Sequence, residues 1–325
     1  MVSGMCGGGV RGKTMARLVG ALLVLLVEQA AAGMLTLSGP QSIGMVATSP
    51  AAAAFKLLPA QRYVATNRFR VRESREAAFE KRWADRKSRL GLLEGFRFFC
   101  MMRRVDNFDG TPYEDDINYI SCTVWEKEEN FDAWKTGDAF KEAHGGGTVG
   151  GIASMLLATA MNTKGKPKAA MWEAILPVTM PPSTPTSSDS GWREVVADGE
   201  NMLDAEAFIA MNRFSVLPGM EATFESRFAS RESTLSEYDG FKGFLLLRRD
   251  GPDPDGFTHS TWSAWRDRAA FDAWRTSENR SGKLKDKAPE GEKPARAGPP
   301  SIYARPPVPT FYDGILVLES EKGVQ

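Results

Sequence analysis

The chain contains only two histidines, and one of them marks a difference between two copies of a repeated motif. The motif Phe-Asp-Ala-Trp occurs at residues 131–134 and again at residues 271–274. The first copy continues to His144, whereas the second has Leu284 at the equivalent position. A neutral imidazole binds metal ions, and a leucine side chain has no ligating atom. His144 is therefore the first candidate for a metal ligand.

Other kinds of chemistry have little support in the sequence. Two histidines cannot form a multi-histidine metal site. Cys100 and Cys122 are not in a Cys-x-x-Cys arrangement, and we expect both to be buried thiols. The glycine-rich residues 145–151 do not form a Gly-x-Gly-x-x-Gly pattern after a strand, so we expect no bound nucleotide or flavin. A formal net charge of zero gives no electrostatic argument for a nucleic acid partner.

The repeat extends well beyond this motif. Residues 67–104 match residues 212–249 at a constant offset of 145, and residues 125–176 match residues 265–316 at an offset of 140. The second copy is therefore five residues shorter, since 145 − 140 = 5. The loss falls in a segment rich in Asp, Asn, Gly and Pro, which predicts a hairpin loop. The chain is a duplicated domain.

The elements that would position His144 can be read in the first copy. Residues 63–71 alternate in polarity and predict a strand. Phe79, Trp83, Arg86 and Leu90 fall on one face of a helix. The second copy repeats both patterns, so we expect the same two elements there.

The remaining elements follow in a regular order. Residues 97–104 and 119–125 predict a hairpin of two strands, and residues 128–135 a short helix. A second short helix would begin with Asp138 as its N-cap and end at His144, and residues 170–176 would form a closing strand. The order β-α-β-β-α-β is the ferredoxin-like arrangement of an α+β domain. One face of each such sheet is bare, so we expect the two tandem domains to form an intrachain α/β barrel, a pseudo-dimer.

The first copy contains four segments that resemble a known family. They are Asn67-Arg68-Phe69, Leu93-Glu94-Gly95-Phe96, Thr123-Val124-Trp125, and Phe131 to Lys135 running on to His144. Each copy resembles the antibiotic-biosynthesis-monooxygenase (ABM) domain, a dimeric α+β barrel, and the first is similar to the IsdG-type haem-degrading monooxygenases. The resemblance implies three site residues: His144 as the proximal ligand of haem iron, Asn67 near the distal ligand and Trp134 against the porphyrin.

Each of these residues also has a structural interpretation. Asn67 and Trp134 recur as Asn212 and Trp274, so a hydrogen bond or a packing role would account for them. We expect Arg86 and its counterpart Arg231 to pair with carboxylates, with a haem-propionate role as the alternative. His259 is expected to be structural.

An apolar stretch at residues 152–161 follows His144 in the first copy only. We expect Met155 and Leu156 in this stretch to help bind haem as part of an apolar lid. The alternative is that the stretch only packs on the barrel. The equivalent region of the second copy is charged and rich in proline.

These residues lead to one expected function and two alternatives. The first is a haem-binding, haem-degrading monooxygenase with one competent site, which uses haem as cofactor and substrate, O2, and an external reductant supplied by a separate electron-donor reductase. The second is a cofactor-free monooxygenase that acts on a phenolic or quinol-like compound. The third is a non-enzymatic haem carrier or a structural barrel.

The N-terminal residues predict a targeting leader. Arg11, Lys13 and Arg17 precede an apolar run at residues 18–27, which is typical of a signal peptide and too short for a comfortable transmembrane helix. Residues 30–72 contain no Asp or Glu, so we expect a transit peptide behind the signal and delivery to a plastid, with secretion as the alternative. The mature chain would then have no stable membrane span. We expect a leader at residues 1–60, a catalytic domain at 61–180, a linker at 181–204 and a supporting domain at 205–320.

Overall fold

The structure is a computed structural model in which two copies of an α+β unit form one closed barrel. The described residues are 56–179, 190–231, 233–251, 255–277 and 302–320. All described residues belong to one compact unit, which begins at Phe55.

The first copy has the expected strands and two short helices, with one longer helix added. Its elements are β1 (Arg62–Phe69), α2 (Glu76–Ala84), the 3-10 turn η1 (Leu90–Leu92), β2 (Phe96–Val105), β3 (Tyr119–Trp125), α3 (Glu128–Thr136), α4 (Asp138–Ala143), α5 (Val149–Asn162) and β4 (Lys168–Thr179). The β-α-β-β-α-β order is therefore confirmed. The five-residue difference falls in the β2–β3 loop, where the sequence predicts it.

The second copy repeats this order in its described residues. Its elements are β5 (Ala207–Phe214), α6 (Glu221–Ala229), η2 (Leu235–Glu237), β6 (Phe241–Asp250), β7 (His259–Trp265), α7 (Arg268–Thr276) and β8 (Val308–Glu319). Asp267 caps α7 by accepting a hydrogen bond from the Ala270 amide, which satisfies one free N–H at the helix start. The segment that would correspond to α4 and α5, including Leu284, lies outside the described residues.

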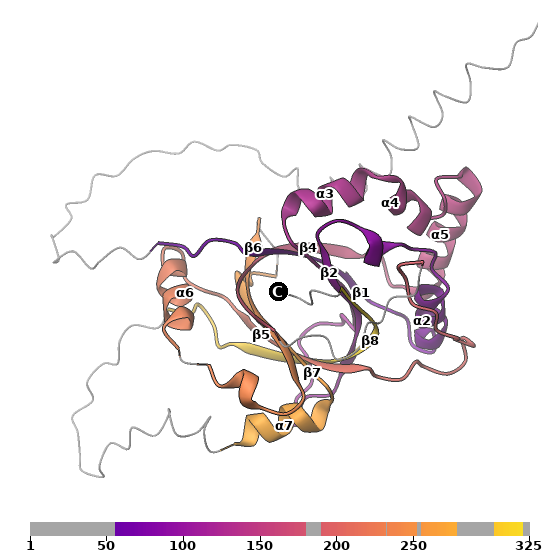
Figure 1. Ribbon diagram of the computed structural model, residues 1–325. Helices are drawn as coiled ribbons and strands as arrows, with labels where there is room; N and C mark the ends of the chain where they lie inside the picture. The colour runs from indigo at the N-terminus through magenta and orange to yellow at the C-terminus, as the bar shows by residue number, and fades with distance from the viewer. Residues whose placement is uncertain (1–55, 180–189, 232, 252–254, 278–301, 321–325) are drawn as a thin grey trace, which may run out of the picture. The chain divides into compact units, whose positions relative to one another are not determined.

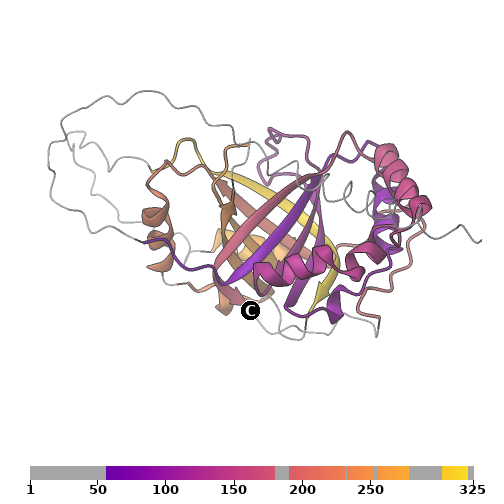
Figure 2. The same cartoon turned by 90° about the horizontal axis from the view of Figure 1, so that it is seen from above.

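The barrel is closed by an exchange of the last strand of each copy. The hydrogen-bonded order is β1-β3-β2-β8-β5-β7-β6-β4, with β4 paired in turn to β1. Strand β8 of the second copy pairs with β2 of the first, and β4 of the first pairs with β6 of the second. Figure 1 shows the strands arranged around one axis, and Figure 2 shows helices outside them. The expected intrachain barrel is confirmed, and closure leaves the sheet no free edge.

The same irregularity occurs in both exchanged strands. Leu176 in β4 and Leu316 in β8 adopt positive φ angles of 52° and 53°, and the register of each strand slips next to them. A positive φ is costly for leucine, so its repetition at equivalent positions indicates a bulge that the barrel imposes. We infer that the bulges let each strand bend from its own copy onto the other.

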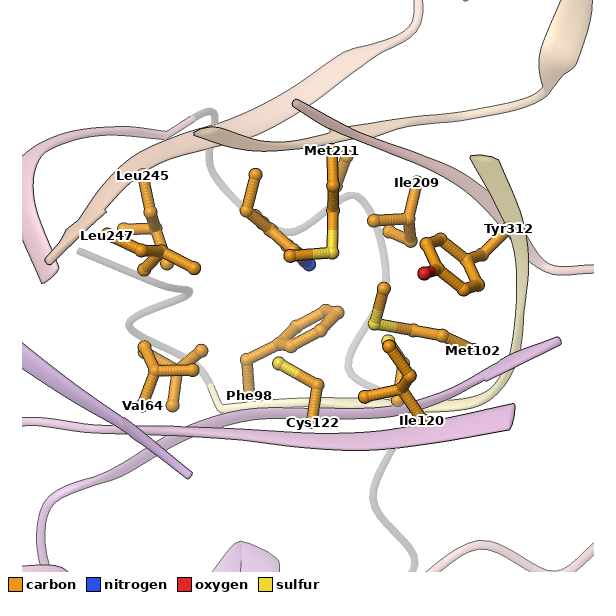
Figure 3. Packing of buried hydrophobic residues seen from close by; sticks show 14 of the residues in the cluster. Val64, Phe98, Met102, Ile120, Cys122, Ile209, Met211, Leu245, Leu247 and Tyr312 are labelled. Carbon is orange, nitrogen blue, oxygen red and sulfur yellow. The ribbon is translucent and has the colours of Figure 1, made fainter. Parts of the chain in front are cut away.

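Alternate strand residues fill the inside of the barrel with apolar side chains. Val64, Phe98, Cys122, Met211 and Leu245 belong to this buried cluster, and Figure 3 shows such side chains reaching inward from strands of both copies. Both cysteines of the described chain are buried and free, as expected. The inner faces of the two sheets thus cover each other.

A buried glutamate ties the first helix of each copy to its sheet. Glu80 of α2 is fully buried and accepts hydrogen bonds from Arg103 on β2 at 3.0 Å and from the Tyr119 hydroxyl on β3 at 2.7 Å. Glu225 of α6 is equally buried and accepts from Arg248 on β6 at 2.7 Å. Buried carboxylates are tolerated only when paired in this way.

The segment before each copy crosses to the other copy at the same glutamates. The Leu203 amide donates to Glu80 at 2.6 Å, and the Leu58 amide donates to Glu225 at 2.7 Å. Leu58 also packs against the core of the second copy, although the expected leader runs to residue 60. Leu58 is therefore in contact with the second copy, although it lies within the expected leader.

One expected helix is shorter than predicted, and part of the expected linker packs on the first copy. The helix predicted to carry Phe79, Trp83, Arg86 and Leu90 ends at Ala84, and Leu90 begins a separate 3-10 turn. Arg86 lies in the connection, where its side chain reaches α4. In the expected linker, residues 190–204 pack on the first copy, where the Trp192 ring lies 5.1 Å from that of Phe99.

Replacing either buried glutamate tests whether the glutamate–arginine pair that joins the helix to the sheet stabilises each copy. Glu80→Ala and Glu225→Ala should each lower the free energy of unfolding by about 3 kcal/mol, because an arginine loses its buried partner. The control Glu142→Ala, which breaks an exposed pair with Arg89, should change it by less than about 1 kcal/mol. Chemical denaturation measures all three, and a cost for the buried glutamates no larger than the control would contradict the assignment.

Candidate functional site

The three predicted site residues lie on the outer side of the first copy's sheet. Asn67 is exposed on β1, on the same face as Tyr63 and Ala65, which pack under α3. Helices α3 and α4 lie outside the barrel, with α5 and α2 beyond them (Figures 1 and 2). The site is thus a region between a sheet face and helices, separate from the barrel interior.

Trp134 on α3 has both a packing role and one unexplained polar atom. Its ring lies 5.7 Å from those of Trp125 and Phe131. In the second copy the Trp274 ring lies 5.4 Å from Trp265 with the same interplanar angle of 31°, so this packing is common to both copies. The Trp134 indole N–H is buried without an acceptor among the described residues. Packing accounts for the ring but leaves the N–H unexplained.

His144 is the C-cap of α4 and lies in an aromatic cluster. Its ring stacks on that of Phe140 at 3.9 Å, and its centroid is 6.3 Å from the Trp134 ring. The structure therefore brings Trp134 and His144 together, as the sequence predicts. Asn67 is on the same side of the sheet, but its side chain makes no hydrogen bond to either ring among the described contacts.

The hydrogen bonds of His144 determine which ring nitrogen carries the proton. Nδ1 lies 2.7 Å from the Phe140 carbonyl oxygen, which can only accept, so Nδ1 is the donor. Nε2 lies 3.1 Å from an Arg86 guanidinium nitrogen, which can only donate, so Nε2 is the acceptor. The 3.4 Å approach of Arg86 to Nδ1 joins two donors and is no hydrogen bond. The imidazole is neutral with its lone pair on Nε2, the tautomer that binds metals through Nε2.

Arg86 donates a hydrogen bond to the lone pair of His144 Nε2, and among the described residues it pairs with no carboxylate. Its Nε donates to the Ala143 carbonyl at 3.0 Å, and its guanidinium lies 4.7 Å from the centre of the Trp83 ring. Burial, with a smaller contribution from Arg82, lowers the pKa of Arg86 to about 10. The expectation that Arg86 pairs with a carboxylate is wrong among the described contacts. The early end of α2 places Arg86 in the loop that faces α4.

The pKa of His144 follows from this position. Burial and the neighbouring positive charge of Arg86 lower it to about 3, against a smaller opposing effect of the Phe140 carbonyl. The ring therefore stays neutral, and its nitrogen stays available as a ligand, throughout the physiological range.

Glycines flank α4 on both sides. Gly137 precedes this short helix, and Gly145, Gly146 and Gly147 follow it with φ angles of 94°, 67° and 65°. A side chain at Gly145 would meet the Gly151 backbone at 2.5 Å, so only glycine fits there. The tight reversal after His144 thus depends on glycine conformations.

Met155 and Leu156 lie on α5, which packs beside α2. The Met155 carbonyl accepts a hydrogen bond from Arg82 at 3.1 Å, whereas Leu156 is 47% exposed. Thr148 caps the helix by accepting from the Gly151 amide. The apolar stretch lies within the helix α5, but Leu156 faces solvent to a large extent, and its part in binding haem stays a prediction.

The second copy lacks this arrangement in its described residues. The asparagine itself is retained: Asn212 is half-buried, and its side-chain oxygen has no hydrogen-bond donor among the described residues. His259 is 1% exposed on β7, 3.4 Å from Glu225 and 3.0 Å from the Thr258 hydroxyl. Its ring takes the place of Tyr119 beside the buried glutamate, which supports the structural interpretation of His259.

The donor set fits an iron porphyrin better than a bare metal ion. No group of three or more His, Cys, Asp or Glu side chains in the described part of the chain could hold a metal. One neutral imidazole beside large aromatic rings suits a ligand that brings four nitrogen ligands of its own. The sequence did not single out Phe140, and it indicated Arg86 only as a possible contact to a haem propionate. The Phe140 ring and the Arg86 guanidinium lie next to His144, so a porphyrin would have to displace them. Phe140 lies at the helical spacing i, i+4 from His144, which could have indicated the contact.

The pH dependence of stability tests the neutral state of His144. Its folded pKa of about 3 lies below the value of about 6.5 expected in the unfolded chain. The resulting stability is fully present above pH ~6.5 and is lost as the pH falls toward 3, because only the unfolded chain then binds the proton. Unfolding of His144→Gln should depend less on pH in this window than unfolding of the wild type. Parallel curves for the two proteins would contradict the assignment.

No helix in the described part of the chain is long and apolar enough to span a membrane.

Comparison with known proteins supports the family. The Antibiotic biosynthesis monooxygenase model matches residues 62–146 and 207–281, one match in each copy. A staphylobilin-producing heme oxygenase from Staphylococcus haemolyticus is 34% identical over 83 residues, which is 25% of this chain and 72% of that protein. A solved Fusobacterium nucleatum protein assigned as a monooxygenase has a TM-score of 0.50 at 9% identity and covers 81% of this chain and 96% of its own, which supports the fold alone.

A second solved structure is the heme degrader MhuD of Mycobacterium tuberculosis with two hemes bound. It is 23% identical, covers 34% of this chain and 96% of its own, and has a TM-score of 0.26. The family match in both copies and the identity to the staphylococcal protein agree with the barrel described above. The chain belongs to the antibiotic biosynthesis monooxygenase family, with two tandem domains in one polypeptide.

Proposed function

We propose that this protein is a haem-degrading monooxygenase with one competent site, in the first copy. The observation that carries the proposal is the neutral His144 ring, whose Nε2 lone pair is held by a single displaceable donor, Arg86. The 34% identity to a heme oxygenase supports the same substrate. Haem would be the substrate and would also bring the iron at which O2 reacts.

Each site residue of the first copy would have a distinct role in binding haem. His144 would bind the iron through Nε2, while the Phe140 carbonyl keeps the proton on Nδ1. Trp134 would press on the porphyrin, and its buried N–H is free to donate to a bound group. Asn67 would donate an amide hydrogen near the distal ligand without adding charge. Met155 and Leu156 would shield the apolar disc from water.

The reaction also requires electrons from outside this protein. The chain carries no nucleotide or flavin fingerprint, so a separate reductase is the proposed donor. The products would be free iron and an open-chain tetrapyrrole. A plastid location, reached through the leader, is proposed on the same sequence grounds, and sequencing the mature N-terminus tests it.

A second candidate is a cofactor-free monooxygenase acting on a phenolic or quinol-like compound. The observation in its favour is that Asn67 and Trp134 have counterparts in Asn212 and Trp274, with nearly the same tryptophan packing. A reaction that needs no iron ligand could then occur in both copies. The absence of a counterpart to His144 favours the first proposal, since symmetric chemistry would need no such residue.

A haemin titration with the reductant ascorbate separates these functions. The wild type should give a Soret band that bleaches when ascorbate is added in air. His144→Ala should bind haemin about tenfold more weakly or worse and should not bleach, because the iron loses its protein ligand. Trp134→Phe should alter bleaching, whereas its matched control Trp274→Phe should not. Binding without bleaching would indicate a carrier, and no Soret shift would leave the cofactor-free enzyme.

Arg86 gives an independent test, because the iron and the guanidinium compete for the same lone pair. Arg86→Leu should tighten haemin binding by about tenfold, the equivalent of one charge-assisted hydrogen bond. The matched control is Arg231→Leu at the equivalent position of the second copy, which should leave affinity unchanged. Weaker binding by Arg86→Leu would overturn the competition and would assign Arg86 to a haem propionate.

A further inference from the structure

Helix α5 of the first copy presents an apolar face to solvent. The exposed apolar residues of this face are Val149, Ala153, Leu156, Leu157, Ala160 and Met161. The four larger side chains among them are between 47% and 67% exposed. At about 100° per residue all six lie on one side of the helix. No charged side chain interrupts this side, because residues 143–163 contain no Asp, Glu, Lys or Arg.

The opposite side of α5 packs on α2, and this contact sets the direction of the apolar face. Arg82 on α2 donates to the Met155 carbonyl and to the Thr159 hydroxyl, both at 3.1 Å. Met155 and Thr159 are four residues apart, on the side of the helix away from Leu157. Figure 1 shows α5 beside α2 on the outside of the barrel. The apolar face therefore points away from the barrel.

Basic side chains lie together at the C-terminal end of α5. The Lys164 amide donates to the Arg70 carbonyl at 2.7 Å. The Arg72 amide donates to the Asn162 carbonyl at 2.8 Å. These backbone bonds bring the segment after β1 to the segment that carries Lys164 and Lys166, and both lysines are exposed.

The charge at this end of the helix is positive. Asp116 pairs with Arg70 at 3.5 Å, and the exposed Glu73 is next to Arg72 in the sequence. The two lysines make no ion pair among the described residues. Residues 143–172 contain no Asp or Glu. Two positive charges therefore remain beside the apolar face.

An anionic lipid surface fits both features. Apolar side chains of a helix that lies in a membrane surface enter the boundary between head groups and acyl chains, and lysines next to them bind anionic head groups. A second copy that docked through the same face would offer the lysines no carboxylate, since residues 143–172 have none. We propose that α5 docks this protein peripherally on an anionic membrane, with Leu157 and Met161 inserted and Lys164 and Lys166 on the head groups. The proposal does not depend on haem, and Leu157 and Met161 are not among the residues proposed to contact haem.

Co-sedimentation of the haem-free full chain with lipid vesicles tests the apolar part. The vesicles contain phosphatidylcholine, with or without phosphatidylglycerol as the anionic lipid. Leu157→Ser should bind the anionic vesicles at least about fivefold more weakly, because an exposed leucine loses its burial in lipid. The control Val196→Ser, at a 98% exposed position outside α5, should bind like the wild type. Both variants keep the N-terminal residues, so a difference between them reports the effect of α5.

Replacing the two lysines tests the electrostatic part. The double variant Lys164→Gln, Lys166→Gln should bind anionic vesicles about twentyfold more weakly, at about fivefold per lysine, and should bind neutral vesicles like the wild type. The control Lys127→Gln removes an exposed charge at the start of α3 and should have no effect. Variants of Leu157 and of the two lysines that bind as tightly as their controls would overturn the proposal.

Hydrogen–deuterium exchange of the wild type locates the contact. Amides of α5 should exchange more slowly when anionic vesicles are added, whereas amides of α7 (Arg268–Thr276) should not change. Slowing that leaves out α5 would overturn the proposal. A dimer that forms without vesicles and is lost in Leu157→Ser would also overturn it, by assigning the face to a second copy. Either result leaves the haemin titration unaffected, because that experiment contains no lipid.

Discussion

The structure depends on one constraint: each copy has a sheet with an apolar face that it cannot bury alone. The inner faces of the two sheets therefore cover each other, and the last strand of each copy is hydrogen-bonded into the other. Burying apolar surface at roughly 25 cal/mol per Å² makes this mutual cover the main stabilising contribution. Two further features make each copy structurally dependent on the other. The exchanged strands carry bulges at Leu176 and Leu316. The segment before each copy donates a backbone hydrogen bond to the buried glutamate of the other copy, from Leu58 and from Leu203.

This dependence explains how the copies can differ in chemistry and remain alike in structure. The buried glutamates Glu80 and Glu225 keep their arginine partners in both copies, because losing either would weaken the whole barrel. Residues outside the barrel can change without breaking these buried pairs. The region around His144 can therefore differ between the copies, and in the described residues of the second copy His259 lies beside the buried Glu225.

Much of the architecture could be predicted because it depends on sequence patterns within short segments. The two offsets, the alternating strands and the motif ending at His144 are visible along the chain, and they gave the repeat, the barrel and the proximity of Trp134 to His144. Long-range contacts were not predictable in this way. Nothing near Arg86 in the sequence shows that α2 ends two residues earlier and lets it reach His144 Nε2. The pairing of Asp115 with Arg213, 98 residues away, likewise requires the closed barrel.

The central claim is that His144 alone provides the iron ligand, and the chain offers a matched control because its only other histidine is His259. Resonance Raman spectroscopy of the ferrous haem complex detects the iron–histidine stretch directly. The account predicts this band in the wild type and in His259→Gln, and its loss in His144→Gln. A band that survives in His144→Gln, or that disappears in a folded His259→Gln, would contradict the account.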